Sequence, residues 1–344
     1  MRRPAVGIAF AAALALAAGA LFWFSDAFNR PGPLARDLNQ VIPKGAGVDH
    51  IARLLLDRNI IANSLVFSFG VRINRNQGHL KAGEYAFTAG ISARGIMELL
   101  LSGKTVVRRI TLPEGLTTAE ILARINGAYG LVGAVKPVPE EGSLLPDTYH
   151  YSYGDGRNGL VLRMEQAMAR TLAQSWARRN PDLPLKSPRE ALILASIVEK
   201  ETALDHERPL IAAVFLNRLK RRMRLQSDPT VAYGLAMAPG FEARGAARSG
   251  ARLRNRRLTR EDLDVPTPFN TYLIAALPPA PIANPGRAAI AAVLDPAKSD
   301  VLYFVADGQG GHAFARTLRE HNRNVARWRR IQRQQTKPQQ SKPK

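Results

Sequence analysis

The sequence predicts an α+β protein with a single amino-terminal transmembrane helix, a small mixed module and a larger mixed domain. Three observations lead to this prediction. A chain of 344 residues suits roughly two domains of about 150 residues each. A long uncharged apolar run stands at its start. The remainder mixes short strand-like runs with apolar residues at helical spacing, separated by Pro- and Gly-rich turns.

The apolar run comes first along the chain. Arg2 and Arg3 precede an uncharged stretch over residues 4–25, long enough for one membrane crossing. We predict a cytoplasmic end over 1–4, a transmembrane helix over 5–25 with Phe22-Trp23-Phe24 at the far interface, and a linker over 26–37. A cleaved signal peptide is the alternative, with Ala18-Gly19-Ala20 as its cleavage site. The anchor is favoured because the run continues through Phe24.

A compact module is predicted over residues 38–105. It contains no pair of acids, so a binding or spacing role is favoured over catalysis. Its expected elements are a strand at 40–42, a helix near 48–55, a helix capped by Asn63 or Ser64, a strand at 80–87 and a helix that starts after Ser92 and stops at Gly103.

The larger domain is predicted over residues 106–330. Asp147 and Tyr149 lie on a loop stiffened by Pro146, which suits either a sugar-lining wall or a structural turn. Asp228, followed by proline, is expected to cap a helix. The other expected elements are a strand at 106–112, a helix at 118–126, a loop at 127–142, helices at 161–178 and 211–219, a flexible basic loop at 240–260, rigid Pro-rich loops at 277–286, a strand at 301–305 and a disordered basic tail at 331–344.

One helix in this domain carries two glutamates at its end. Ser187-Pro188-Arg189-Glu190 predicts its start, as a capping box with proline in the first turn. Glu201 falls on the stripe of Leu194 and Ile197, which should face the core. A carboxyl group in apolar surroundings has a raised pKa, in the range useful for proton transfer.

The other glutamate, Glu199, lies about 160° away around the helix. The pattern therefore selects Glu201 as the half-buried acid. The helix pattern alone favours a plainer interpretation, in which both glutamates are solvated and one pairs with Lys200 or Arg208.

Composition excludes several kinds of chemistry. The chain has no cysteine, and its six histidines lack metal-ligand spacing, so we expect no metal and no cofactor. The net charge of +21 indicates polyanionic neighbours. No nucleic-acid-binding motif accompanies this charge, so anionic lipid or an acidic polymer is favoured over nucleic acid.

Several motifs in order resemble the endolytic murein transglycosylases of the YceG-like family (MltG). They span most of Leu112 to Trp328. The matching segments are Ala195–Thr202, Leu225–Thr230, Asn270–Tyr272, Leu277–Pro279 with Pro281–Ala283, and Tyr303–Gly308 with Gly311-His312. Phe269 and Leu145 depart from the pattern, where tyrosine and phenylalanine are expected.

The resemblance implies a fold, an activity and a place in the cell. It implies a membrane anchor, a LysM-like module over 38–105 and a catalytic domain in the periplasm. It also implies lytic cleavage of the β-1,4 bond between N-acetylmuramic acid and N-acetylglucosamine, leaving a 1,6-anhydro end. The catalytic glutamate of the family is the one followed by threonine, here Glu201. Glu201 alone would serve as acid and then base, because the muramyl 6-hydroxyl replaces water as the nucleophile.

The resemblance also supplies candidate ligands and partners. The substrate would be peptidoglycan glycan strands, with inner-membrane lipid around the anchor. Peptidoglycan synthases and proteins of the division or elongation machinery are further candidate partners. A non-catalytic glycan-binding scaffold with the same fold is the alternative function. Candidate substrate-binding residues are Glu199, Gln226, Asp228, Asn270, Tyr272, Asp147 and Tyr149.

Overall fold

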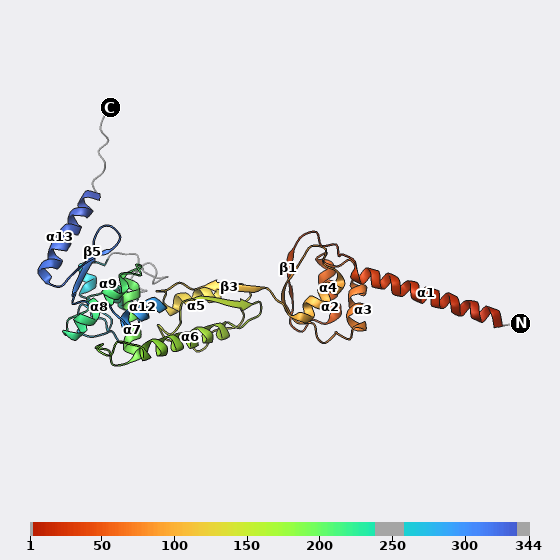
Figure 1. Ribbon diagram of the computed structural model, residues 1–344, viewed down its shortest axis with the longest axis horizontal. Coiled ribbons are helices and arrows are strands. Elements are labelled where there is room, and N and C mark those ends of the chain that lie inside the picture. The colour runs from red at the N-terminus through yellow and green to blue at the C-terminus, as the bar shows by residue number, and fades with distance from the viewer. Residues whose placement is uncertain (1–2, 238–257, 336–344) are drawn as a thin grey trace, which may run out of the picture. The chain divides into compact units, whose positions relative to one another are not determined.

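The computed structural model describes residues 3–237 and 258–335. It is a mixed α and β structure with two compact units (Figure 1). The first unit ends at Arg109 and also takes in residues 128–132 and 150–156, and the second contains the rest. Most of the basic loop predicted at 240–260, and residues 336–344 of the predicted tail, lie outside the described residues.

Helix α1 (Arg3–Asn29) is long and apolar enough to cross a membrane, with a mean hydropathy of 2.1 over its most apolar window. It continues to Asn29, so the first four residues of the predicted linker are helical. Near this end Phe28 is buried and stacks on Phe24, with ring centroids 5.7 Å apart. The last turns of α1 therefore belong to the core of the first unit.

The rest of the first unit is a small sheet with three helices. Strands β1 (Leu38–Ile42) and β2 (Gly83–Phe87) pair antiparallel, with Gln40 opposite Tyr85. Helices α2 (Val48–Asp57), α3 (Ser64–Ile73) and α4 (Ala93–Ser102) pack with them. Asn63 caps α3, Ser92 caps α4, and Gly103 ends α4 in a left-handed conformation, all as predicted.

A two-stranded sheet and two helices come next along the chain. Strand β3 (Val107–Thr111) pairs with β4 (Thr148–Ser152). Helix α5 (Thr118–Asn126) starts and ends where predicted. Its start is fixed by a complete capping box between Thr117 and Glu120. Helix α6 (Arg157–Ala177) follows β4.

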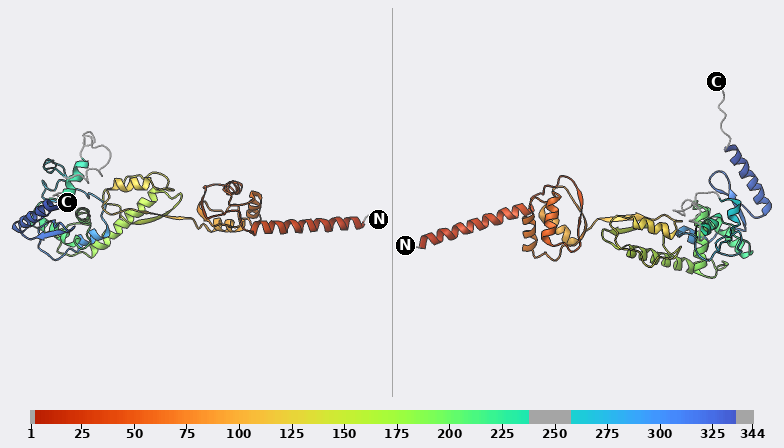
Figure 2. Two further views of the ribbon diagram at one scale, coloured as in Figure 1. Left: turned by 90° about the horizontal axis from the view of Figure 1, so that it is seen from above. Right: turned by 180° about the vertical axis from the view of Figure 1, so that it is seen from behind.

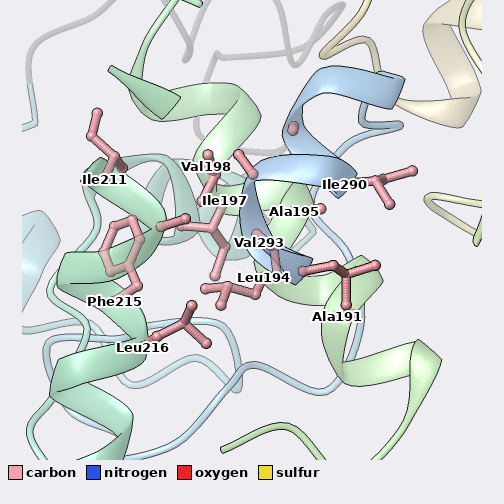
Figure 3. Close-up of a cluster of buried hydrophobic side chains, with 14 of the residues drawn as sticks. Ala191, Leu194, Ala195, Ile197, Val198, Ile211, Phe215, Leu216, Ile290 and Val293 are labelled. Carbon is pink, nitrogen blue, oxygen red and sulfur yellow. The ribbon is translucent and has the colours of Figure 1, made fainter. Parts of the chain in front are cut away.

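The core of the second unit is built around α7 (Pro188–Glu201). Helices α8 (Arg208–Lys220) and α12 (Arg287–Leu294) pack against it, and Figure 3 shows their apolar side chains interdigitating. Two shorter helices, α9 (Asp228–Met237) and α11 (Arg260–Leu263), lie near one another in this unit.

A hairpin and a helix complete the second unit. Strands β5 (Tyr303–Ala306) and β6 (His312–Ala315) pair antiparallel, with Ala306 opposite His312. Helix α13 (Leu318–Gln335) packs along the hairpin (Figure 2). The prediction of a disordered tail from residue 331 is wrong for residues 331–335, which continue α13.

Candidate active site

Helix α7 carries Glu201 as its last residue. The Ser187 hydroxyl accepts a hydrogen bond from the Glu190 N–H, and Pro188 lies in the first turn, as predicted. The Glu190 carboxylate accepts from the Lys186 N–H instead of the Ser187 N–H, so only half of the expected capping box forms. Thr202, in an extended conformation, ends the helix.

The surroundings of α7 correct the interpretation drawn from helical phase. Residues 193–198 are buried on every side, because α7 runs through the centre of the core (Figure 3). Glu199 does not lie on a solvated face, since its side chain is only 5% exposed. Glu201 is half-buried, so helical phase alone does not separate the two glutamates by burial.

The carboxyl group of Glu201 lies inside the second unit. Ser227 donates a hydrogen bond to it from its hydroxyl group. Burial raises the pKa of Glu201 to about 7, and the negative charge of Asp228 adds to this increase. The Ser227 hydrogen bond and the charges of His312 and Arg218 act in the opposite direction. A carboxyl group with this pKa can both give and take a proton near neutral pH.

Ser227 is fixed by contacts to the segment around Thr271. Its N–H donates to the Thr271 hydroxyl at 2.9 Å, and the Gln226 N–H donates to the Thr271 carbonyl at 3.1 Å. Gln226 adopts a left-handed backbone conformation with φ of 53°, which turns the chain at this point. Two sequence motifs are thus held together next to Glu201.

Arg218 supports the same segment from α8. Its guanidinium group is buried and donates to the carbonyls of Leu225 and Leu302, at 2.6 and 2.8 Å. It also lies over the ring of Tyr303. One buried cation therefore joins the segment before Ser227 to the β5–β6 hairpin.

Asp228 and Tyr272 form a polar pair beside this group. The Tyr272 hydroxyl donates to the Asp228 carboxylate at 2.7 Å. Burial, together with this hydrogen bond, raises the pKa of Tyr272, so the hydroxyl keeps its proton. Asp228 is the first residue of α9 and is exposed. The charges of both Asp228 and Glu201 raise the pKa of Tyr272, so the pair lies close to Glu201.

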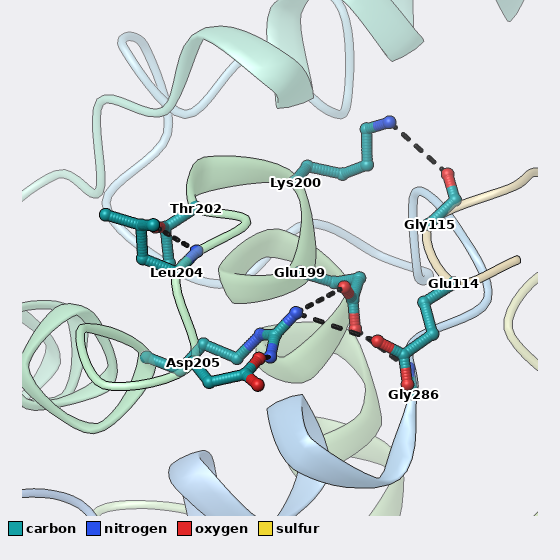
Figure 4. Close-up of polar contacts among 9 residues, drawn as sticks. Glu114, Gly115, Glu199, Lys200, Thr202, Leu204, Asp205 and Gly286 are labelled. Carbon is teal, nitrogen blue, oxygen red and sulfur yellow. Dashed lines mark hydrogen bonds and ion pairs between the residues drawn. The ribbon is translucent and has the colours of Figure 1, made fainter. Parts of the chain in front are cut away.

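Glu199 belongs to a different network (Figure 4). It accepts a hydrogen bond from the Gly286 N–H at 2.9 Å and pairs with Arg208 at 3.4 Å. Arg208 also pairs with Glu114 and Asp205. Burial raises the pKa of Glu199, while the Gly286 hydrogen bond opposes the increase. The predicted pairing with Arg208 is confirmed, but it occurs in an enclosed site and not in solvent.

Three further candidates have clear structural contacts. Asn270 is fully buried, and its amide group donates to the carbonyls of Leu263 and Val265 and accepts from the Tyr272 N–H. Asp147 lies beside Arg287 at 3.7 Å, and the Tyr149 hydroxyl donates to the Leu145 carbonyl. Burial raises the pKa of Tyr149 to about 12. Among the described residues, the contacts of Asp147 and Tyr149 do not include Ser227 or Glu201.

A separate groove lies at the opposite end of α7. It has a volume of about 480 Å³, and its lining includes Ser187, Glu190, Ile193, Pro278 and Pro279. The first part of the Pro-rich loop predicted at 277–286 lines this groove. The residues around Glu201 do not line it, so the groove and the buried acid are distinct features.

Ser227 and His312 are the site residues that the sequence did not single out. Ser227 lies within the quoted motif over 225–230, beside the candidates Gln226 and Asp228. His312 lies within the quoted Gly311-His312 pair, and its ring pairs with Glu207 at 2.6 Å. Each residue was part of a recognised motif, but its contacts depend on segments far along the chain.

Comparison with known proteins identifies the family. The family model described as the YceG-like family matches residues 40–327. The chain belongs to the YceG-like family. The two departures from the family pattern both fall in the core, since Leu145 is fully buried and Phe269 packs edge-on against Tyr233.

Curated relatives carry a common name. A protein of Bacillus subtilis named endolytic murein transglycosylase is 29% identical, over 83% of each chain. A protein of the same name from Streptococcus pneumoniae is 30% identical over 83% of this chain and 57% of its own length, so the match spans little more than half of that relative. A solved YceG-like protein of Listeria monocytogenes is 31% identical, covering 84% of this chain and 99% of that one with a TM-score of 0.48.

Proposed function

We propose that this protein is an endolytic murein transglycosylase with Glu201 as its catalytic acid and base. The name shared by its relatives supports the reaction class. The observation that carries the assignment is the half-buried Glu201 carboxyl group, hydrogen-bonded to Ser227, whose pKa of about 7 leaves much of it protonated at neutral pH. Glu199 is a weaker candidate because Arg208 and the Gly286 N–H already occupy its carboxylate.

The proposed reaction transfers one proton each way. Protonated Glu201 gives its proton to the glycosidic oxygen as the bond from that oxygen to the muramyl anomeric carbon breaks. The muramyl 6-hydroxyl oxygen then bonds to the same carbon, and its proton goes to the Glu201 carboxylate. The products are an N-acetylglucosamine end and a 1,6-anhydro muramyl end, and no water is consumed.

A single carboxyl group suffices for this chemistry. Most glycosidases need a second carboxylate, either as nucleophile or as base for water. Here the substrate supplies the nucleophile. The Ser227 hydroxyl would hold Glu201 in position, and the carboxylate of Asp228, oriented by Tyr272, would stabilise positive charge on the sugar ring.

We further propose a place in the cell for this activity. Helix α1 would be a single-pass anchor in the inner membrane, with residues 1–4 in the cytoplasm and the catalytic domain over 106–330 in the periplasm. The module over 38–105 would be LysM-like and bind glycan. Inner-membrane lipid would surround α1. Cell fractionation with amino-terminal sequencing tests the anchor, and a mature chain that starts at Leu21 would contradict it.

The activity is tested with the full-length chain in detergent and purified peptidoglycan. Wild type is expected to release fragments with anhydro ends, and Glu201→Gln to lose at least a thousandfold in rate, because Gln has no transferable proton. Glu199→Gln is the matched control and should retain most of the activity. Mass spectrometry of the products in ¹⁸O-labelled water separates the mechanisms, because hydrolysis incorporates the label and lytic cleavage does not.

Two results would contradict the proposal. Equal activity of wild type and Glu201→Gln would remove Glu201 from the mechanism. Tight glycan binding by wild type without any cleavage would instead favour the non-catalytic scaffold.

A further inference from the structure

His312 is held in one orientation by a buried carboxylate. The backbone N–H of His312 donates to one oxygen of Glu207 at 2.7 Å, and the ring Nδ1 lies 2.6 Å from the other oxygen. The Glu207 side chain is only 7% exposed. Two contacts to one carboxylate fix both the backbone and the ring of His312.

The same carboxylate reaches the residue after Glu201. The Thr202 hydroxyl donates to Glu207 at 3.3 Å. It accepts from the Leu204 N–H at 3.0 Å (Figure 4). Glu207 therefore connects the end of α7 to the start of β6. His312 is close enough to Glu201 for its charge to lower the pKa of that acid.

The turn before His312 is built to allow this approach. Asp307 accepts hydrogen bonds from the N–H groups of Gln309 and Gly311. A Cβ atom on Gly311 would lie 2.8 Å from a Glu207 oxygen, so only glycine leaves room for the carboxylate. The glycine at position 311 therefore allows the turn of the hairpin to lie directly against the Glu207 carboxylate.

The tautomer of His312 follows from its partner. The hydrogen bonds from His312 and Thr202 hold the pKa of Glu207 below its ordinary value despite the cost of burial, so Glu207 accepts and does not donate. Nδ1 must then carry the proton in this bond. Among residues 3–237 and 258–335, no recorded hydrogen bond uses the other nitrogen, Nε2, and the side chain is 19% exposed. Nε2 is thus available to a ligand.

We propose that His312 contacts the glycan through Nε2, as a hydrogen-bond partner for a sugar hydroxyl or acetamido group at the Glu201 site, and that Glu207 is its positioning residue. This inference rests on the proposed function. The carboxylates that face His312 are Glu207 from the start of α8, Asp307 from the hairpin turn and Glu201 from α7. Phe304 and Phe314 pack against its ring and leave the nitrogens to polar partners.

The first test measures binding of peptide-free glycan strands to the full-length Glu201→Gln chain in detergent, which keeps the strands uncut. His312→Phe in this background keeps an aromatic ring between Phe304 and Phe314 but removes both nitrogens. We expect three- to tenfold weaker binding, the effect of one lost hydrogen bond. Glu207→Gln should weaken binding in the same direction, because its amide can donate to Nδ1 and reverse the tautomer.

The matched control is His321→Phe. His321 stacks on Tyr303 from α13, with ring centroids 5.2 Å apart, and phenylalanine can keep that stacking. This control should bind glycan as the background does. Equal binding by folded His312→Phe and by the control would overturn the proposal.

A second measurement leaves position 312 unchanged. Diethyl pyrocarbonate modifies free imidazole nitrogens, and peptide mass spectrometry gives the rate at each histidine of the Glu201→Gln chain. Saturating glycan should slow modification of His312 at least fivefold and leave the exposed His206 unaffected. Unchanged modification of His312 in a chain that binds glycan would overturn the inference. If glycan protects His312 in the Glu201→Gln chain but wild type does not cleave glycan, the proposed reaction is wrong and the contact of His312 with glycan still holds.

Discussion

The carboxyl group of Glu201 stands between opposing influences. Burial and the charge of Asp228 favour its protonated form, while the Ser227 hydroxyl and the charges of Arg218 and of His312 in its protonated form favour its ionised form. The outcome is a pKa of about 7, near the value that best suits one group acting as both acid and base. Each influence comes from a separate side chain and can be removed on its own.

The alkaline side of the pH profile should report this balance. The reaction needs protonated Glu201, so kcat/KM of wild type should fall tenfold per pH unit above about pH 7. Ser227→Ala removes a bond that lowers the pKa, so its decline should begin at higher pH. Asp228→Asn removes a charge that raises the pKa, so its decline should begin at lower pH. Shifts of both variants in the same direction would contradict this assignment.

The free energy of unfolding should also depend on pH through Glu201. The folded-state pKa of Glu201, about 7, lies above the ordinary value of 4.5. The contribution of Glu201 to stability is fully present below pH 4.5. It is lost as the pH rises through 7, because the folded protein must then hold an ionised carboxylate in a partly buried site. The free energy of unfolding of Glu201→Gln should therefore exceed that of wild type at pH 8, by up to about 3 kcal/mol. The difference should be smaller at pH 5. Denaturant unfolding of the two chains at both pH values measures this, and a pH-independent difference would contradict it.

At the scale of elements, Arg208 joins three segments of the second unit. It pairs with Glu199 at the end of α7, with Glu114 after β3, and with Asp205 before α8 (Figure 4). The Arg208 and Glu199 side chains are 7% and 5% exposed, whereas Glu114 is 41% exposed. The network is therefore buried on one side and open to solvent on the other.

This asymmetry predicts unequal effects of two substitutions. Arg208→Met leaves the enclosed Glu199 carboxylate without its cation, which should cost about 3–5 kcal/mol of unfolding free energy at pH 8. Glu114→Gln removes only the exposed partner and should cost less than about 1 kcal/mol. Denaturant unfolding compares the two variants, and similar costs would mean that Arg208 is held mainly by other contacts.

Local signals in the sequence predicted the elements whose ends are fixed by neighbouring residues. Helix α5 has its whole capping box within four residues, and Ser92 and Gly103 bound α4 in the same local way. Strand β4 and helix α12 were not predicted, because β4 depends on pairing with β3 and α12 on packing against α7. Helix α13 was not predicted either, and its last five residues were assigned to a disordered tail because of their basic composition.

The candidate site divides in the same way. Helical phase and the motif both selected Glu201, and its half-buried position and raised pKa agree with that choice. Helical phase did not predict that the Glu199 side chain is buried as well, because that burial comes from Arg208 and Gly286. Asn270 was named as a candidate substrate-binding residue, and in the structure its amide group binds the backbone carbonyls of Leu263 and Val265. The pairing of His312 with Glu207 joins residues 105 positions apart, and no local pattern encodes such a contact.

At the scale of the whole molecule, α1 joins an apolar membrane-length run to a folded unit. Phe28 rests directly on the backbone of α3 at Gly70, where a Cβ atom would lie 2.2 Å from its ring. Phe24 packs edge-on against Phe69, with centroids 5.0 Å apart. The glycine in α3 is thus explained by a close approach and not by an unusual backbone conformation.

Gly70→Ala should therefore destabilise the first unit. Alanine in a helix interior is normally about 1 kcal/mol better than glycine. Here we expect a loss of about 1–3 kcal/mol, because Phe28 must move. Gly159→Ala in α6 is the matched control, with open space around its Cβ, and should be neutral or stabilising. Limited proteolysis with increasing denaturant measures Gly70→Ala in the first unit and Gly159→Ala in the second. A neutral or stabilising effect of Gly70→Ala would contradict the close contact with Phe28.

The continuity of α1 has a mechanical consequence. No break separates its apolar run from the turn that carries Phe28, so the first unit has no swivel at that point. In a membrane, a tilt of the helix would turn the first unit through the same angle. The anchor would then act as a lever as well as a tether, and bilayer thickness, which changes helix tilt, would set the direction in which that unit faces.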